Sequence, residues 1–377
     1  MKNIFILSII LSFTLVSCGQ IQKAENNKKI QNPTNKYDYE IVVSDLENPW
    51  GFVFLPDDSM LINEKKGDLV LVKNDKKILV KNMPAVYNRG QGGLLDIALH
   101  PNYKSNGWIY FTYASAEGEG DGGNTALMRA KLENESLVQK ELLYKATPNT
   151  TRGQHFGSRI VFDAENNVYF SIGERGNRDE NPQDVTRDGG KVYRLKDDGS
   201  IPTDNPFYAS AEAKKAIYSY GHRNPQGMEV QPQTKEIWLH EHGPMGGDEI
   251  NVVKKGANYG WPIITYGKNY SGIPITDKTA QVGMEQPIHY WVPSIAPSGM
   301  AFVTSNKYPK LKGGLLVGSL KFQYLEFLKL DGKKIVERTK LLENIGRVRS
   351  INQAEDGYIY VGVENLGIVK LNPLKND

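Results

Sequence analysis

A unit of two short apolar strands joined by a polar turn recurs along this chain and constrains its fold more than any other feature. Each copy alternates Ile, Val, Leu, Tyr and Phe with smaller or polar residues and turns on Pro, Asp, Asn or Gly. The copies begin at Trp50, Leu94, Gly157, Gly227, Gly299 and Val348. Alternation of period two predicts strands, and serial repetition of such units is typical of a propeller. We therefore expect an all-β chain folded as a six-bladed β-propeller, with four-stranded antiparallel blades around a central channel. A pair of β-sandwiches explains the repeat less well.

The segments between the copies have unequal lengths and indicate insertions on one face of the ring. The longest insertions are expected at 114–124, 175–188 and 266–287, and a short helix at 209–215. The apolar segment 39–43, which precedes the first copy, is free to complete the last blade. Pairing of the two ends of the chain would close the ring.

Composition agrees with a protein made of many short strands and turns. The chain has 37 glycines, 19 prolines and 20 tyrosines, a bias toward tight turns and away from long helices. Its net charge is only +3, and no long run of Lys and Arg occurs. Nucleic acid is therefore not an expected partner.

Residues 1–18 are expected to form a lipoprotein-type signal peptide. Lys2 supplies a positive charge, and 4–16 is an apolar run too short and too near the start for a membrane span. The run ends in LVSCG, which resembles the bacterial lipobox, and Cys18 is the only cysteine of the chain. Cys18 is thus the expected lipidation site, and an ordinary secretory signal is the alternative.

The rest of the chain divides into a tether and one folded domain. Residues 19–38 are rich in Asn, Lys and Gln, which predicts a disordered tether, and 39–377 form the propeller domain. We expect an exported bacterial lipoprotein, periplasmic or anchored at the outer membrane, that meets the membrane only through its lipid.

A histidine near the start of the third copy is a candidate general base. His155 follows Gln154, and its neighbours Gly157 and Ser158 are small or polar, which does not suit an apolar core. A neutral imidazole accepts protons efficiently near neutral pH. A structural role is the alternative for an isolated histidine.

Cations at the strand ends of different copies form a second candidate group. Arg223-Asn224 precedes Pro225, Lys321 follows an apolar strand, and Arg347 and Arg349 are two residues apart and so share one strand face. Each one alone is compatible with a surface cation or an ion pair. If the ring brings them together they require an anion, and a polycarboxylate or a phosphate would satisfy them.

A Gly-Pro turn followed by two acids is a candidate metal site. Gly243 and Pro244 offer carbonyl oxygens, and Asp248 and Glu249 offer carboxylates, a ligand set that suits Ca²⁺. His240 and His242 are expected on one strand face and suggest a transition metal instead. That alternative lacks a third His or Cys ligand nearby.

A set of motifs runs along the chain in the order GQGGLLDIALHP, QHFGSRIVFD, GHRNPQGM, HEHGPMGGDEIN, NYGWP, PSIAPSGMAF, GSLK and GRVRS. This set resembles the soluble PQQ-dependent sugar dehydrogenases, and among them the compact aldose sugar dehydrogenases of the glucose/sorbosone dehydrogenase family. The resemblance covers residues 39–373. It implies PQQ and Ca²⁺ as cofactors, an aldose as substrate, oxidation of the anomeric carbon to a lactone, and an external electron acceptor.

The resemblance also implies a role for each matching residue. His155 matches the base that takes the anomeric proton, and Arg223 matches the cation that stabilises the developing oxyanion. The cofactor contacts match Arg223, Asn224, Gln226, Lys321, Arg347 and Arg349. The calcium ligands match the carbonyls of Gly243 and Pro244, with Asp248 and Glu249 at a second, structural calcium. The sugar pocket matches Gln91, Gln154 and Trp291.

Two positions depart from the pattern of the glucose-specific members. Gln154 stands where those members carry an acidic residue, and Arg175 stands where they carry an amide near the sugar. The chain is also shorter, so a narrow specificity for glucose is not expected. A propeller lipoprotein that binds a glycan or a protein without catalysis is the main alternative. A propeller lactonase would need acidic ligands from several blades, and such acids are evident only at Asp248 and Glu249.

Overall fold

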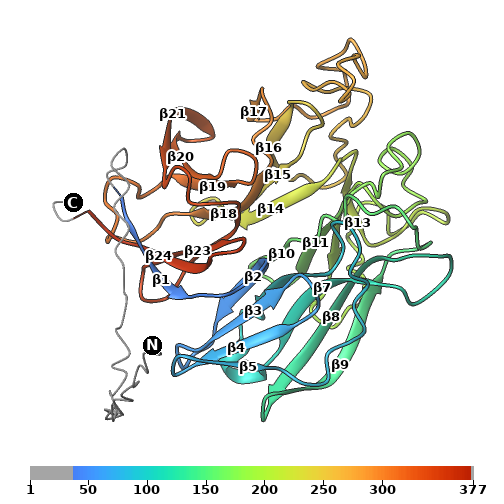
Figure 1. Ribbon diagram of the computed structural model, residues 1–377. Coiled ribbons are helices and arrows are strands. Elements are labelled where there is room, and N and C mark those ends of the chain that lie inside the picture. The colour runs from blue at the N-terminus through green and yellow to red at the C-terminus, as the bar shows by residue number, and fades with distance from the viewer. Residues whose placement is uncertain (1–36, 375–377) are drawn as a thin grey trace, which may run out of the picture.

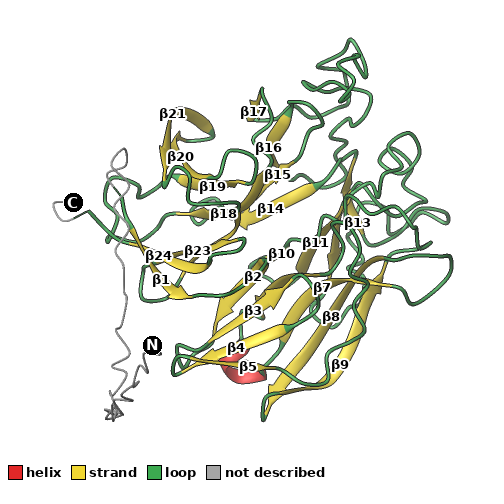
Figure 2. Ribbon diagram, in the orientation of Figure 1, coloured by secondary structure: helices red, strands yellow, loops and turns green. Residues whose placement is uncertain are grey.

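The computed structural model describes residues 37–374 and confirms the six-bladed propeller. Six separate four-stranded antiparallel sheets are arranged as blades around a common centre (Figure 1). Within the described residues the only α-helix is α1 (Tyr103–Asn106), so strands and loops make up nearly the whole molecule (Figure 2). Between residues 37 and 374 no helix has the length and apolarity needed to cross a membrane.

Each blade is built from four strands that follow one another in sequence, and the sixth alone combines both ends of the chain. The first three blades consist of β2 (Pro49–Phe54), β3 (Met60–Glu64), β4 (Leu69–Lys73) and β5 (Lys76–Leu79); β6 (Leu94–Leu99), β7 (Ile109–Ser115), β8 (Asn124–Glu133) and β9 (Ser136–Lys145); and β10 (Ile160–Phe162), β11 (Val168–Ile172), β12 (Lys191–Leu195) and β13 (Ile217–Tyr220). The last three consist of β14 (Pro225–Val230), β15 (Ile237–Glu241), β16 (Asp248–Val252) and β17 (His289–Trp291); β18 (Pro297–Phe302), β19 (Leu315–Ser319), β20 (Tyr324–Asp331) and β21 (Lys334–Leu341); and β22 (Val348–Gln353), β23 (Ile359–Val363), β24 (Gly367–Leu371) and β1 (Tyr39–Val43).

The hydrophobic core lies between the blades, because each sheet packs against a neighbour on both of its faces. All five residues of β11 are therefore buried, although its sequence has period-two character. Phe170 and Tyr193, on adjacent strands of one blade, stack with ring centroids 5.0 Å apart and are both fully buried. Burial on both faces explains why a strand such as β11 is short, apolar and without charged residues.

The ends of the chain close the ring as the sequence predicts. Strand β1 pairs antiparallel with β24, with Tyr39 opposite Leu371 (Figure 1). The innermost strand β2 of the first blade also contacts the innermost strand β22 of the last. The folded part begins slightly earlier than the tether boundary predicted, since Tyr37 is only 5% exposed and packs in the core. Cys18 and the signal peptide lie outside the described residues.

A β-bulge recurs near the start of the inner strands. In β2, β14, β18 and β22 the register shifts by one residue, which leaves Trp50, Gln226, Gly299 and Arg349 without a partner in the ladder. A bulge redirects the extra residue and frees its backbone groups from the ladder. Two of the residues expected to bind the cofactor, Gln226 and Arg349, occupy this position.

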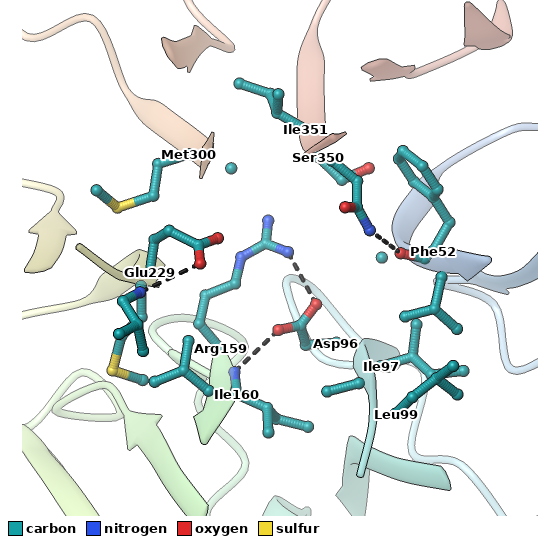
Figure 3. A pocket seen from close by; sticks show the side chains of 18 of the residues that line it. Phe52, Asp96, Ile97, Leu99, Arg159, Ile160, Glu229, Met300, Ser350 and Ile351 are labelled. Carbon is teal, nitrogen blue, oxygen red and sulfur yellow. Dashed lines mark hydrogen bonds and ion pairs between the residues drawn. The ribbon is translucent and has the colours of Figure 1, made fainter. Parts of the chain in front are cut away.

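One buried arginine satisfies the carbonyls that the bulges free. The guanidinium of Arg159 donates to the carbonyl oxygens of Gln226 at 2.7 Å, Arg349 at 2.7 Å and Trp50 at 3.3 Å. It also pairs with Asp96 at 3.0 Å and lies 4.1 Å from the centre of the Trp50 ring. Arg159 thus lies in the central channel and links several blades through hydrogen bonds and an ion pair (Figure 3).

The local predictions met mixed outcomes. The insertions at 114–124 and 175–188 are loops that join β7 to β8 and β11 to β12, and 266–287 lies between β16 and β17. The helix expected at 209–215 is wrong, because the segment consists of turns and bends. Its main-chain bonds are local turns, such as Ser210 N–H to Phe207 O at 3.0 Å, and do not extend into a helical ladder.

Candidate active site

His155 stands at the end of a tight loop before β10, in a left-handed conformation with φ of 59°. Its main-chain N–H donates to Gln91 Oε1 at 2.8 Å. Its Nδ1 contacts the carboxylate of Glu174, which is 2% exposed. A carboxylate can only accept, so Nδ1 carries the proton and the lone pair of the imidazole lies on Nε2. Glu174 thereby orients His155 as a proton acceptor.

The electrostatic surroundings keep that imidazole neutral. Burial lowers the pKa of His155 below its ordinary value of 6.5, and the nearby Arg223 charge lowers it further, against the opposing effect of Glu174. A base must be unprotonated to work, so a lowered pKa keeps His155 active down to lower pH.

The side chain of Arg175 supports the loop that carries His155. Its guanidinium donates to the carbonyls of Gln154, Gly123 and Arg152, the last two at 3.0 and 2.9 Å, and lies 3.4 Å from the centre of the Phe156 ring. Arg175 is only 1% exposed, so it is not available to contact a sugar. Arg175, which replaces an amide of the glucose-specific members, therefore supports the loop and does not line a sugar pocket.

Arg223 is a buried cation without a carboxylate partner among residues 37–374. Its side chain donates to the carbonyls of His242 at 3.0 Å and Gly243 at 2.9 Å, and its guanidinium lies 5.3 Å from the centre of the Trp261 ring. It is 7% exposed, and burial lowers its pKa. An isolated buried charge is unfavourable unless a ligand or another polar group compensates it.

Asn224 presents a free donor beside this cation. Its Oδ1 accepts a hydrogen bond from Gly157 N–H at 3.1 Å, which fixes the orientation of the amide. The buried Nδ2 then has no hydrogen-bond partner within the described chain. Unpaired buried donors are rare in folded proteins and indicate a site for an acceptor from outside the chain.

The structure brings the predicted cations to the same end of the channel. Arg349 donates to Gln226 Oε1 at 3.2 Å, and Arg347 to the carbonyl of Leu320, next to Lys321, at 3.1 Å. Both arginines share one carboxylate, that of Glu364. The exposed Lys321 adds a third charge, and its Nζ lies 5.1 Å from the centre of the Phe322 ring. The group retains excess positive charge, as an anionic ligand requires.

The Gly243–Pro244 turn is held by Asp248, which has a different role from the one predicted. Its two carboxylate oxygens accept hydrogen bonds from the N–H groups of Gly243, Ile295 and Ala296 and from Ser294 Oγ, at 2.7 to 3.0 Å. With its acceptor sites occupied, Asp248 is a support of the turn and not a metal ligand. The carbonyls of Gly243 and Pro244 are oxygen donors of the kind Ca²⁺ takes, although that of Gly243 already accepts a hydrogen bond from Arg223.

Glu249 faces Glu241 instead of Asp248. Asn251 Nδ2 lies 3.2 Å from Glu249 Oε2 and 3.4 Å from Glu241 Oε1, and both acids line a cavity of about 10 Å³. Burial and the Glu241 charge raise the pKa of Glu249 to about 8. One buried and one half-buried carboxylate beside a space for one small particle fit a cation, although no group of three His, Cys, Asp or Glu is present in the described chain.

The two histidines of the same segment are structural. His240 Nε2 hydrogen-bonds the carbonyl of Gly299 at 3.1 Å, and His242 Nε2 that of Pro297 at 2.7 Å. Burial lowers the pKa of His240 to about 3 and holds that of His242 well below its usual range. Each is thus a neutral donor to a main-chain carbonyl, which excludes these Nε2 atoms as metal ligands.

Comparison with known proteins assigns the family. The family model described as Glucose / Sorbosone dehydrogenase matches residues 46–369. The chain belongs to the glucose/sorbosone dehydrogenase family. It is 39% identical to an aldose sugar dehydrogenase of Escherichia coli (strain K12) over 330 residues, which cover 85% of this chain and 88% of that protein.

Solved structures of family members agree with this assignment. The soluble aldose sugar dehydrogenase of Escherichia coli in its apo form superposes with a TM-score of 0.86 at 36% identity, covering 89% of this chain and 99% of that one. The PQQ-bound aldose sugar dehydrogenase of Streptomyces coelicolor superposes with a TM-score of 0.72 at 27% identity, covering 88% and 96%.

Of the residues expected to line the sugar pocket, the structure keeps two near the base. Gln91 is exposed and bonds the main chain of His155, and Gln154 is the neighbour of the base. Trp291, in contrast, is 2% exposed, and its Nε1–H donates to Glu326 Oε2 at 2.9 Å within a core cluster. In this family member Trp291 therefore supports the fold between two blades.

The structure adds site residues that the sequence analysis missed. Tyr270, on the 266–287 insertion, hydrogen-bonds the side chain of Arg223 and is 76% exposed. Its neighbour Asn269 accepts from Arg178 Nη1 at 2.7 Å, which joins two insertions across the site. Glu174 is the other addition, and its place right after β11 in a Gly-Glu-Arg turn was the one local signal for it.

The paired carboxylates predict a calcium-dependent stability that this family member should show. Without a cation, the folded protein holds the Glu249 proton more tightly than the unfolded chain does, so this proton stabilises the fold. The stabilisation is complete below the ordinary pKa of 4.5 and is lost as the pH rises to about 8. We expect Ca²⁺ to raise the Tm at pH 8. The variant Glu249→Gln should show no rise of the Tm with Ca²⁺, and its stability should fall much less as the pH rises. Thermal unfolding with and without chelator measures this, with Glu212→Gln on the exposed surface as control. An equal Ca²⁺ shift in Glu249→Gln would contradict it.

Proposed function

We propose that this chain oxidises aldose sugars at the anomeric carbon to lactones, with PQQ and Ca²⁺ as cofactors and an external electron acceptor. Its family and its relatives make it a sugar dehydrogenase, and one of the similar structures holds PQQ. We further propose export and anchoring through Cys18, on the strength of the N-terminal segment.

The observation that carries the proposal is the unpaired polar set at Arg223 and Asn224. A buried guanidinium without a carboxylate partner among residues 37–374 and a buried amide donor without a partner suit an anionic, oxygen-rich ligand. PQQ, a quinone with carboxylates, has that chemistry. Arg349, Arg347 and Lys321 would hold its carboxylates, Arg223 and Asn224 its quinone side, and the carbonyls of Gly243 and Pro244 the Ca²⁺.

The residues of the chain account for the proton chemistry. When bound, PQQ supplies a hydride acceptor and Ca²⁺ a Lewis acid that polarises it. His155 takes the proton of the anomeric hydroxyl on Nε2, and the carboxylate of Glu174 stabilises the imidazolium that forms. Arg223 presents fixed N–H donors to developing negative charge in a buried site, where they are most effective. Arg175 and Gln91 fix the loop that carries the base.

The experiment is a titration of the purified protein with PQQ in the presence of Ca²⁺, followed by a panel of aldoses and a redox dye. We expect saturable PQQ uptake, and dye reduction with several aldoses. Uptake of PQQ without dye reduction on any aldose would overturn the catalytic proposal. Failure to take up PQQ would favour a propeller that binds a glycan or protein without catalysis.

A further inference from the structure

The central channel contains a second chamber, on the other side of Arg159 from the proposed cofactor site. The inner strands start beside the site, since β14 follows Arg223-Asn224 and β22 starts next to Arg349. The chamber is lined by the opposite ends of these strands, at Phe162, Val230 and Asn352. It has a volume of about 340 Å³ (Figure 3). Because Arg159 is bonded to several blades, it separates the chamber from the cofactor site.

The walls of the chamber combine apolar side chains with polar groups. Each of the six inner strands contributes to them, with side chains such as Phe52, Ile97, Ile160, Met228, Met300 and Ile351. A pocket of this size that contains both apolar side chains and convergent polar groups can hold a small molecule. The ionisable residues that line it are Asp96, Arg159 and Glu229.

Glu229 is the one of these three that has no ionic partner in residues 37–374. Asp96 and Arg159 neutralise each other at 3.0 Å, and Asp96 also accepts the N–H of Ile160 at 2.9 Å. Glu229 accepts only the N–H of its neighbour Val230, at 3.1 Å, through Oε1. Figure 3 shows its carboxyl group directed into the chamber beside Met300. The free charge of the chamber is therefore negative and lies on Glu229.

We propose that this chamber binds a small organic cation, a primary ammonium group on a short apolar stem, with Glu229 as its counter-ion. The ammonium would donate to the unpaired Oε2, and the stem would lie against the methionine and isoleucine walls. Metal ions fit less well, because Ca²⁺ takes six to eight oxygens and Mg²⁺ keeps much of its water. The chamber offers a single carboxylate without an ionic partner, because Asp96 is already paired with Arg159.

Proton linkage gives this site a characteristic signature. Burial and, to a smaller extent, the charge of Asp96 together raise the pKa of Glu229 to about 7, while Arg159 is engaged by Asp96. A cation binds the ionised carboxylate, so binding strengthens as the pH rises through that value. Near neutral pH, binding releases a proton from Glu229.

The test is calorimetric titration of the full chain with n-butylammonium, with 1-butanol as the neutral isostere. We expect saturable binding with Kd on the order of 1 mM or tighter, about 10-fold weaker at pH 6 than at pH 8. Titrations at pH 7 in two buffers of different ionisation enthalpy should reveal proton release. 1-Butanol should bind much more weakly.

Variants assign the effect to Glu229. Glu229→Gln should abolish ammonium binding and proton release, and Glu165→Gln, on the exposed surface, should leave both unchanged. Dehydrogenase activity of Glu229→Gln should match the parent, which shows that the ring is folded. Absence of saturable binding, equal binding of 1-butanol, or unchanged binding in Glu229→Gln would each overturn the proposal. The comparison of ammonium with alcohol needs no variant, so the test survives a variant that fails to fold.

Discussion

His155→Asn in the PQQ-loaded protein lowers kcat/KM about 10²–10⁴-fold, the usual effect of losing a general base. Asparagine is the appropriate replacement, because the left-handed φ of 59° at this position is tolerated by Asn better than by most residues. The amide cannot accept the anomeric proton. PQQ uptake should be retained, since the proposed cofactor contacts lie on Arg223, Asn224 and the cations of the last two blades. Steady-state kinetics and a PQQ titration measure the two effects separately.

Glu174→Gln is the companion variant. Loss of the carboxylate removes the group that fixes Nδ1–H and stabilises the imidazolium, and we expect kcat to fall about 10²-fold with a smaller change in KM. The acid limb of the pH profile should also move, because Glu174 raises the pKa of His155. An unchanged kcat/KM in His155→Asn would rule out His155 as the base.

Arg159→Met lowers the free energy of unfolding by about 3–5 kcal/mol, the range for breaking a buried ion pair. The variant leaves Asp96 charged and buried, and it frees the carbonyls of Trp50, Gln226 and Arg349. Because Gln226 and Arg349 are proposed cofactor contacts, PQQ affinity should fall as well. Urea denaturation and a PQQ titration report the two losses.

Two further variants show whether the loss of stability in Arg159→Met comes from the broken buried ion pair or would follow the loss of any charged side chain. The double variant Arg159→Met with Asp96→Asn should recover part of the stability, since it removes the uncompensated charge. Lys73→Met breaks an exposed ion pair with Asp57 and should cost about 1 kcal/mol or less. Equal costs for Arg159→Met and Lys73→Met would show that Arg159 does not tie the blades together.

The propeller could be predicted because its signal is repeated. A single hairpin pattern is weak, but copies of the same pattern along one chain leave few architectures, and β1 was available to close the last blade. The cations were predictable for a related reason. Arg223, Lys321 and Arg349 occupy strand ends in different copies, and a ring brings such ends to a common centre.

The partners of the site residues could not be predicted, because they depend on how strands and loops meet in space. Nothing local distinguishes Asp248, which holds a turn, from Glu249, which lies opposite Glu241 on the adjacent strand. Arg175 departs from a motif, yet the direction of its side chain follows from the fold of the loop. Tyr270 belongs to an insertion without periodicity, so no pattern could place its hydroxyl on Arg223.

The pairing of β1 with β24 makes the order of synthesis matter. The first strand of the domain leaves the ribosome long before its partner strand is synthesised. Until then β1 presents an open edge, and open edges are templates for pairing with other chains. Contacts of such long sequence separation are also slow to form. The sixth blade should therefore be the last to assemble. Its open edge at β1 is the part of the chain that a chaperone would need to cover first. A protein from which β1 has been removed by truncation after Val43 would have five complete blades and a sixth blade without its edge strand.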